Sequence, residues 1–390
     1  MRHLIPQTMT PRTPIRRYAS TALLVAALGI GSSSFLSAEN AFWTEFGTQP
    51  VFVEQNNYGN TQTLKFIDYK NEMLIAEVEM ANPDGTKSVA EISQPVSDSM
   101  VKTLSFQLKD LKKATRMADT ENYIGALRLM RPEIYPLVKF HLVPESFTQL
   151  HVPVRTLIDT LVNAGEYDEA EDLINRIALD KVSPKYSASA IRLMNAYLQT
   201  SNFDGSARVA NSLPVEGQYS TNIRSVLNTA DALRGAGNYD AVIPLYRAIQ
   251  QAVPANVKRN VDMWLAYSLV LADQLEEATQ IIDSLDEPEP KDELFSLYKL
   301  LQGSREYRKE NYGEALDTLT RGFVRAQTSY SWVPEMLFLI GDCYQRAGDN
   351  QAARNVWTEI TILYPDVPWA KRAADSLAQL PPPPQPKPAE

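Results

Sequence analysis

A small residue that recurs at a nearly constant spacing is the feature that most constrains the fold of this chain. The recurring residues are Ala126, Ala170, Ser206, Val242, Ala278, Ala315 and Ala353, which lie 44, 36, 36, 36, 37 and 38 residues apart. Each one follows a turn-forming stretch rich in Gly, Asn, Asp and Glu. A repeat of this length indicates stacked copies of one supersecondary unit, none of which can bury its apolar side alone.

Two other positions repeat in step with the small residue. Twelve residues before it stand Ile158, Met194, Ala230, Ala266, Gly303 and Gly341. Four residues after it stand Ile174, Ala210, Tyr246, Ile282, Leu319 and Trp357. Small side chains are needed where the two helices of a hairpin touch, and large ones fill the layer between hairpins. The offsets therefore predict a helical hairpin in every repeat.

The last repeat carries the clearest family pattern. Its first helix has apolar–apolar–Gly–x–x–Tyr ending at Tyr344, then the turn at Gly348, the small Ala353, the large Trp357 and a closing Pro365. This pattern resembles a tetratricopeptide repeat (TPR). The segment from Tyr364 to Ala370 also resembles the last repeat of periplasmic Tol-Pal-associated TPR proteins and of outer-membrane assembly lipoproteins. The resemblance implies a non-enzymatic scaffold, with an inner wall of first helices that holds an extended peptide or a partner helix.

We therefore predict a mainly α protein, a TPR-like α-solenoid of about seven hairpins over residues 97–378. A helix is expected to begin near Ser99 behind a Ser97-Asp98 cap, because Leu104, Leu108 and Leu111 share one of its sides. The first interval is longer than the others. A linker containing Pro132, Pro136 and Pro144 is expected to account for the extra length.

Residues 39–95 contain alternating or continuous apolar runs with β-branched and aromatic residues, and they predict a small N-terminal antiparallel β module. Strands are expected at 64–69, 73–80 and 88–93, with turns at 70–71 and 82–85. Three short strands are marginal alone. They should pack on the first helices through Leu74, Ile75, Val78 and the aromatic residues. The module either caps the solenoid or recruits a partner, since a solenoid end needs its apolar face covered.

Both ends of the chain have separate signatures. Residues 1–38 resemble a secretory signal peptide, with Arg16-Arg17 before the apolar run 22–30 and small residues at 37–38. An uncleaved anchor is the alternative, but the run is short for ~30 Å of hydrocarbon. No cysteine follows the run, so no lipid anchor is expected. Residues 379–390 form a proline-rich tail that we expect to be disordered.

The composition favours no enzyme, cofactor or metal. We found no phosphate-binding glycine loop and no paired cysteine or HExxH ligands. The single Cys343 is interpreted as a core residue, and His141 and His151 lack further ligands. Without residues 1–38, which contain four basic and no acidic residues, 34 basic and 47 acidic residues remain, a net charge of −13. That charge argues against nucleic acid as a partner.

The inner wall of first helices is the expected site, because offsets from the small residue identify the side chains that face it. Arg192 with Asn195, and Arg224 with Asn228, share helix faces and can clamp a peptide carboxylate and its backbone. Trp264 and Tyr267 would give an apolar anchor. The whole predicted set is Arg192, Asn195, Arg224, Asn228, Asp231, Trp264, Tyr267, Tyr307 and Arg308, with Asp159, Arg234 and Arg346 at related offsets.

These features predict an exported scaffold or adaptor, periplasmic or associated with the cell envelope, that holds another protein in its groove. Two alternatives remain at this point. One is a substrate-capture or accessory subunit of an export or outer-membrane assembly complex. The other is a cell-wall-glycan binder or an enzyme that uses the β module. The sequence gives no oligomeric state.

Overall fold

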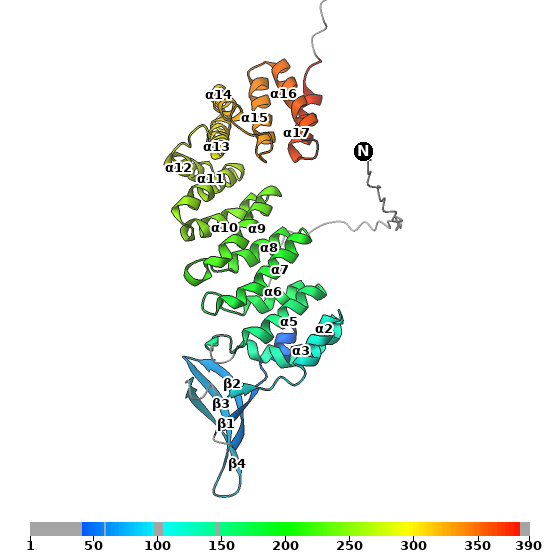
Figure 1. Ribbon diagram of the computed structural model, residues 1–390, viewed down its shortest axis with the longest axis vertical. Coiled ribbons are helices and arrows are strands. Elements are labelled where there is room, and N and C mark those ends of the chain that lie inside the picture. The colour runs from blue at the N-terminus through cyan, green and yellow to red at the C-terminus, as the bar shows by residue number, and fades with distance from the viewer. Residues whose placement is uncertain (1–40, 58–59, 97–103, 146–148, 383–390) are drawn as a thin grey trace, which may run out of the picture. The chain divides into compact units, whose positions relative to one another are not determined.

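The computed structural model describes residues 41–57, 60–96, 104–145 and 149–382 (Figure 1). The predicted leader lies outside these ranges, and so do residues 383–390 of the predicted tail. In the part of the chain that is described, no helix is long and apolar enough to cross a membrane.

An antiparallel sheet follows a short π-helix, η1 (Trp43–Gly47), at the start of the described chain. Within the described residues the strands are β1 (Val51–Asn57), β2 (Asn60–Lys70), β3 (Met73–Ala81), β4 (Lys87–Pro95) and β5 (Leu104–Phe106), in the spatial order β4-β3-β2-β1-β5. The three predicted strands are confirmed as β2, β3 and β4, whereas β1 and β5 were missed. The β2–β3 turn has positive φ at Asn71 and Glu72, 51° and 62°, which suits a tight hairpin.

One face of the sheet packs against the end of the first hairpin. Val53, Phe66 and Leu74 are buried together with Leu137 and Phe140. The prediction that Leu74 makes this contact is confirmed. Ile75 and Val78 are only half-buried and are not part of this cluster. Successive side chains of a strand point to opposite faces, so Leu74 and Ile75 cannot both enter it.

The aromatic residues before the sheet pack on the helices. The Phe42 and Trp43 rings each lie 6.4 Å from the Tyr135 ring. The Arg131 guanidinium lies 3.9 Å from the centre of the Phe42 ring, and that of Arg176 lies 4.2 Å from the Trp43 ring. These contacts agree with a module that caps the first hairpin.

Helical hairpins follow one another through the rest of the chain and form a TPR-like α-solenoid (Figure 1). The pairs are α2 (Leu111–Asp119) with α3 (Tyr123–Val138), α5 (His151–Ala164) with α6 (Tyr167–Asn175), α7 (Ser187–Gln199) with α8 (Phe203–Ser212), α9 (Ile223–Gly235) with α10 (Tyr239–Ala252), α11 (Ala255–Leu271) with α12 (Leu275–Ser284), α13 (Leu294–Arg308) with α14 (Tyr312–Phe323), and α15 (Val333–Arg346) with α16 (Asn350–Leu363). A last helix, α17 (Pro368–Gln379), covers the final hairpin, and its Ala370 and Ala373 join Trp357 in a shared core.

Every predicted turn between the helices of a pair contains a left-handed residue. These residues are Glu121, Gly165, Ser201, Gly237, Asp273, Glu310 and Gly348, with φ between 58° and 84°. A left-handed residue directly after a helix lets the backbone N–H groups that follow satisfy the last carbonyls. Every repeat therefore uses the same left-handed turn, in which the left-handed residue is glycine in three repeats and another residue in four.

The predicted repeat register is confirmed by burial. All seven recurring small residues are fully buried. A Cβ added to Gly303 would lie 2.5 Å from Cγ of Leu319, and one added to Gly341 would lie 2.4 Å from Nε1 of Trp357. Small residues on the first helix thus make room for large ones on the second, as the offsets predicted.

Two predictions near the start of the solenoid are wrong. Residues 104–106 form β5, which pairs with β1, and the first helix after the sheet in the described chain begins at Leu111; the predicted cap at residues 97–98 lies outside the described residues. Pro132 and Pro136 do not form a linker, because both lie inside α3. Proline weakens a helix interior, but Ile134, Tyr135 and Leu137 are buried, and this packing outweighs the lost backbone bonds. The long interval reflects a longer second helix and the additional residues between α3 and α5.

Candidate partner-binding groove

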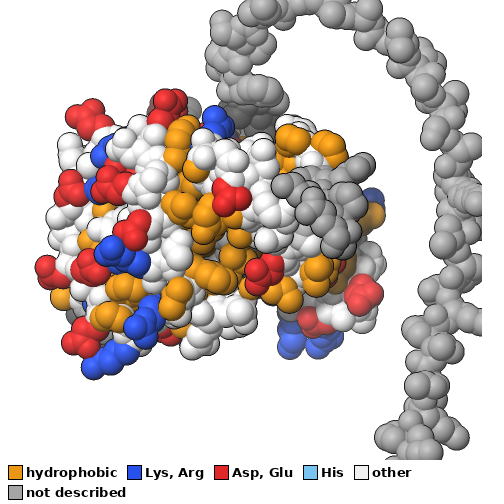
Figure 2. Space-filling view, turned by 90° about the horizontal axis from the view of Figure 1, so that it is seen from above, with side chains coloured by type: hydrophobic (Ala, Val, Ile, Leu, Met, Phe, Trp, Pro, Cys, Tyr) orange, Lys and Arg blue, Asp and Glu red, His pale blue; other side chains and the backbone are white. Residues whose placement is uncertain are grey.

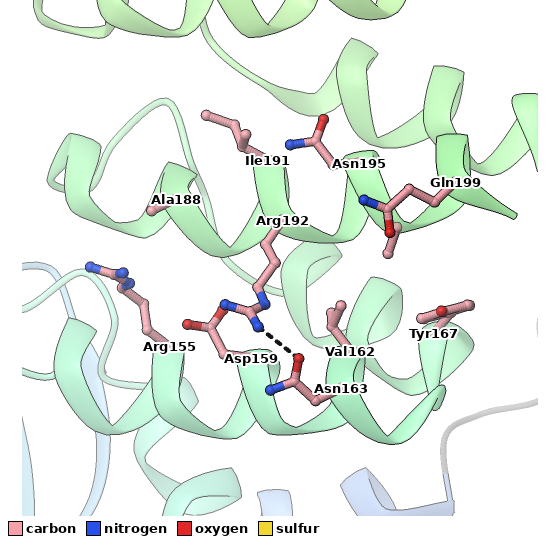
Figure 3. A pocket seen from close by; sticks show the side chains of 11 residues that line it. Arg155, Asp159, Val162, Asn163, Tyr167, Ala188, Ile191, Arg192, Asn195 and Gln199 are labelled. Atoms are coloured by element: carbon pink, nitrogen blue, oxygen red, sulfur yellow. Dashed lines mark hydrogen bonds between the residues drawn. The ribbon is translucent and has the colours of Figure 1, made fainter. Parts of the chain in front are cut away.

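A hollow of about 610 Å³ lies between α5 and α7, the first helices of two successive hairpins (Figure 3). Its polar lining consists mainly of Arg155, Asp159, Asn163, Arg192, Asn195 and Gln199. On α5 these residues are four apart, and on α7 they are three to four apart. Helical periodicity therefore places each set on one face of its helix, turned toward the same space.

The hydrogen bonds of the groove leave donors available. The Arg192 Nη2 donates to Asn163 Oδ1 at 2.6 Å, which links α7 to α5 (Figure 3). The Ser189 hydroxyl donates to Asp159 Oδ1 at 3.0 Å. The Nε–H of Arg155 is buried and has no hydrogen-bond partner in the structure. A buried donor without a partner costs free energy, so a ligand oxygen that drew the Arg155 side chain into the hollow and accepted from this N–H would be stabilised.

The charge of the groove is opposite to that of the chain. The lining has two guanidinium groups, on Arg155 and Arg192, and a single carboxylate, on Asp159. That carboxylate already accepts a hydrogen bond from Ser189. In a chain with a net charge of −9, the lining carries a local excess of positive charge.

The structure brings only part of the predicted set into this groove. Arg192 and Asn195 line it together with Asp159, as the sequence offsets suggested. Arg224 and Asn228 are exposed on α9, which packs on α7, but they do not line the hollow. They lie on the next first helix and extend the same wall.

Trp264, Tyr267 and Asp231 belong to a second cluster. The Asp231 carboxylate pairs with Arg234 at 3.0 Å and accepts a hydrogen bond from the Tyr246 hydroxyl at 3.1 Å. The Arg234 guanidinium lies 3.4 Å from the centre of the half-buried Trp264 ring. Tyr267 is 9% exposed, and its hydroxyl donates to the Glu335 carboxylate of α15. Tyr267 thus serves an internal contact, while Trp264 is partly exposed and its ring also lies 5.7 Å from the Trp332 ring.

Tyr307 and Arg308 connect hairpins. The Tyr307 hydroxyl donates to Asp342 Oδ2 at 2.7 Å, which joins α13 to α15. Arg308 Nη1 lies 3.4 Å from Asp273 Oδ1, in the turn between α11 and α12. Arg346 binds Asp342 on its own helix at 3.3 Å.

The sequence offsets did not single out Arg155, Asn163 or Gln199. Asn163 and Gln199 stand seven residues before the small residues of their repeats, the offset at which Arg308 and Arg346 were noted. The signal was therefore present for both. Arg155 lies one residue away from the offset that identified Arg192, so only the packing of α5 on α7 shows it.

The reactive side chains considered in the sequence are held internally. Burial raises the pKa of the Cys343 thiol to about 12, so the thiol stays protonated at neutral pH. His141 Nδ1 lies 2.7 Å from the Val138 carbonyl, and its Nε2 accepts from the Ala178 amide at 3.2 Å. Burial lowers the pKa of His141. In the described ranges no three metal-binding side chains come together.

No protein-family model and no curated protein matches the sequence. Solved structures give distant matches. One is pilF of Pseudomonas aeruginosa, at 13% identity over 58% of this chain and 97% of that one, with a TM-score of 0.33. Another is the C-terminal part of a TPR repeat-containing protein from Cytophaga hutchinsonii, at 14% identity over 68% and 99%, with a TM-score of 0.35. The assignment of the fold therefore rests on the hairpins themselves.

Proposed function

We propose that this protein is a non-enzymatic scaffold that holds an extended, acidic segment of another protein along its first helices. The observation that carries the proposal is the groove between α5 and α7. It combines two arginines, three side-chain amides and one unpaired buried donor. Arg224 and Asn228 on α9 would continue the contact beyond it.

The groove suits an extended backbone. Asn163, Asn195 and Gln199 each offer both a donor and an acceptor, which is what an extended peptide presents in return. The guanidinium groups offer paired donors for a carboxylate, either a side chain or a chain terminus. Because α5 and α7 are held in place by their direct packing, little of the wall needs to be ordered on binding.

We also propose that the scaffold acts after export, in the cell envelope. The support is the leader pattern of residues 1–38. Fractionation of cells that express the full chain checks this separately from binding. Retention of an unprocessed chain in the cytoplasm would contradict the location without affecting the groove.

Binding is tested with fluorescently labelled extended peptides in an anisotropy titration. An acidic peptide should bind more tightly than the same peptide with Asn and Gln in place of Asp and Glu, and more weakly as salt is added. Arg155→Ala and Arg192→Ala should each weaken binding by about five- to tenfold, because each removes a charge-assisted hydrogen bond. The double variant Arg192→Ala/Asn228→Ala should also weaken binding and leave the melting temperature unchanged.

The matched control is Arg321→Ala on α14, whose side chain is 69% exposed and pairs only with Asp317 of its own helix. This variant should bind as the unaltered chain does. Equal binding of the acidic and neutral peptides would refute the proposal, and so would an equal loss in the control. A drop of several degrees in the melting temperature of the double variant would assign Arg192 and Asn228 to structure instead.

A further inference from the structure

Strand β4 forms an open edge of the sheet. It pairs with β3 on one side, and no other described strand lies on its far side. All nine residues are exposed or half-exposed, and its single proline, Pro95, is the last of them. The opposite edge is the three-residue β5. A long edge strand presents unpaired N–H and C=O groups that can join another strand.

The charges across the sheet are left unbalanced at this edge. Lys65 of β2, Glu77 of β3 and Glu91 of β4 stand opposite one another in register. The Lys65 ammonium pairs with Glu77. Glu91 therefore faces a like charge and forms no ion pair among the described side chains; Lys70 attracts it, but Lys70 is already paired with Asp68. Like charges directly opposite on neighbouring strands are destabilising, so a cation on the far side of Glu91 would be favourable.

We propose that β4 pairs antiparallel with β4 of a second copy of this chain, about a two-fold axis at Val89. Lys87 pairs with Glu79 of its own sheet at 2.9 Å, and both side chains are exposed, so this ion pair is weak. The register places Lys87 opposite Glu91 of the second copy, on both sides of the axis, so that Lys87 lies between two carboxylates. Across the paired sheets, the row of opposed residues then runs from Lys65 through Glu77 and Glu91 of one copy to Lys87 of the second copy. Val89, which is 63% exposed, meets its own symmetry mate.

Charge and side-chain size select this register over its neighbours. An axis at Glu91 would set Glu91 against itself. An axis at Ala90 would place Lys87 opposite Ser93 and Val89 opposite Glu91. Only the axis at Val89 matches lysine with glutamate and valine with valine.

The expected dimer is weak and reversible. Its ladder runs from Lys87 to Glu91 in each copy, because the turn at residues 82–86 precedes it. Such a ladder buries far less than the roughly 1,000 Å² of a stable interface. Association should therefore appear only as the protein is concentrated. It does not depend on the groove between α5 and α7.

Cross-linking of Val89→Cys tests the register directly. Residues opposite one another on paired strands have Cβ atoms about 5 Å apart, within reach of a disulfide. Mild oxidation should give a covalent dimer of the full chain. Phe52→Cys is the control, since Phe52 is 48% exposed on β1, away from this edge. The native Cys343 is buried and should not react. Val89→Cys that cross-links no faster than Phe52→Cys would overturn the proposal.

Charge reversal tests the pairing without a cysteine. In sedimentation experiments across a concentration series, Lys87→Glu should weaken dimerisation by about tenfold or more, because two like-charge pairs replace two attractive ones. The double variant Lys87→Glu/Glu91→Lys restores opposite charges and should restore the dimer. A chain that stays monomeric at every concentration would refute the proposal. The proposal would also be refuted if Lys87→Glu left the dimerisation affinity unchanged, or if the double variant failed to restore that affinity.

Discussion

At the scale of single residues, the turns show how one backbone conformation is met by different side chains. Gly237 has a φ of 82°, and a Cβ placed on it would touch nothing within 4 Å. Glu310 adopts a φ of 63° in the equivalent turn and bears the strain of a side chain there. Glycine at these positions therefore reflects backbone conformation and not a lack of space.

Gly237→Ala should lower the free energy of unfolding by about 1 kcal/mol, since left-handed backbone disfavours any residue with a Cβ. Gly235→Ala is the matched control. Gly235 lies two residues earlier, at the end of α9, also with nothing within 4 Å but without a positive φ. This control should be neutral or stabilising by up to about 1 kcal/mol, because alanine favours helix. Urea denaturation measures the free energy of unfolding of both variants. If both substitutions lower it, the conformational explanation is contradicted.

At the scale of the hairpin, the contact between paired helices leaves no spare volume. Ala353 is fully buried on α16, in the same core as Trp357 and Ala373. Ala353→Leu should cost about 1–3 kcal/mol, because added methylenes in a dense core force neighbours apart. Thermal or urea denaturation measures the cost. Gln351→Leu, on the exposed side of the same helix, should change stability little; a neutral Ala353→Leu would contradict the register.

The hairpins could be predicted because their signals are local and repeated. The left-handed turn, the small residue and its large partner all lie within one repeat, so each copy tests the others. Strands β1 and β5 could not be found in this way. β1 ends in the polar run Glu54–Asn57, and β5 is three residues long and depends on pairing with Val53 some fifty residues earlier. Such a strand exists only because of a distant contact.

The groove was only partly predictable for a related reason. Offsets located the wall, and with it Arg192 and Asn195. They could not show which side chains the fold uses internally. Tyr267 is bound by Glu335, 68 residues later, and Tyr307 by Asp342, 35 residues later. A position on the inner wall is therefore not by itself a position open to a partner.

At the scale of the whole helical array, α11 contacts α15 although their hairpins are not neighbours, and the Trp264 ring lies 5.7 Å from the ring of Trp332, which directly precedes α15. Tyr267 of α11 donates to Glu335 of α15, and the hairpin of α13 and α14 lies between them in sequence. The Tyr239 ring of α10 packs edge-on against the Tyr267 ring, with their centres 6.2 Å apart. Repeat arrays are usually stabilised by contacts between adjacent units. Here a buried carboxyl of α15 accepts a hydrogen bond from α11, two hairpins earlier. Viewed from the end that carries the last helices, hydrophobic side chains gather in a band beside charged ones (Figure 2).

This carboxyl should make the stability of the array depend on pH near neutrality. Burial raises the pKa of Glu335 to about 7, although the Tyr267 hydrogen bond and the nearby Arg372 and Arg308 lower it. In the unfolded chain the carboxyl ionises near its ordinary value of 4.5. Between these two values the unfolded state has lost the proton and the folded state keeps it. Stability should therefore fall by on the order of 3 kcal/mol as pH rises from about 4.5 to about 7, then level off for this group.

Glu335→Gln isolates that contribution, because glutamine keeps an oxygen for the Tyr267 hydroxyl and cannot ionise. Relative to the unaltered chain, the variant should be more stable at pH 8 and similar at pH 4.5, as measured by urea denaturation at both values. Glu359→Gln, exposed on α16, is the control and should show no such pH-dependent difference. The free energy of unfolding of Glu335→Gln could differ from that of the unaltered chain by the same amount at both pH values. That result would mean that the buried carboxyl is already ionised in the folded state, because Arg308 and Arg372 stabilise its charge more than burial disfavours it.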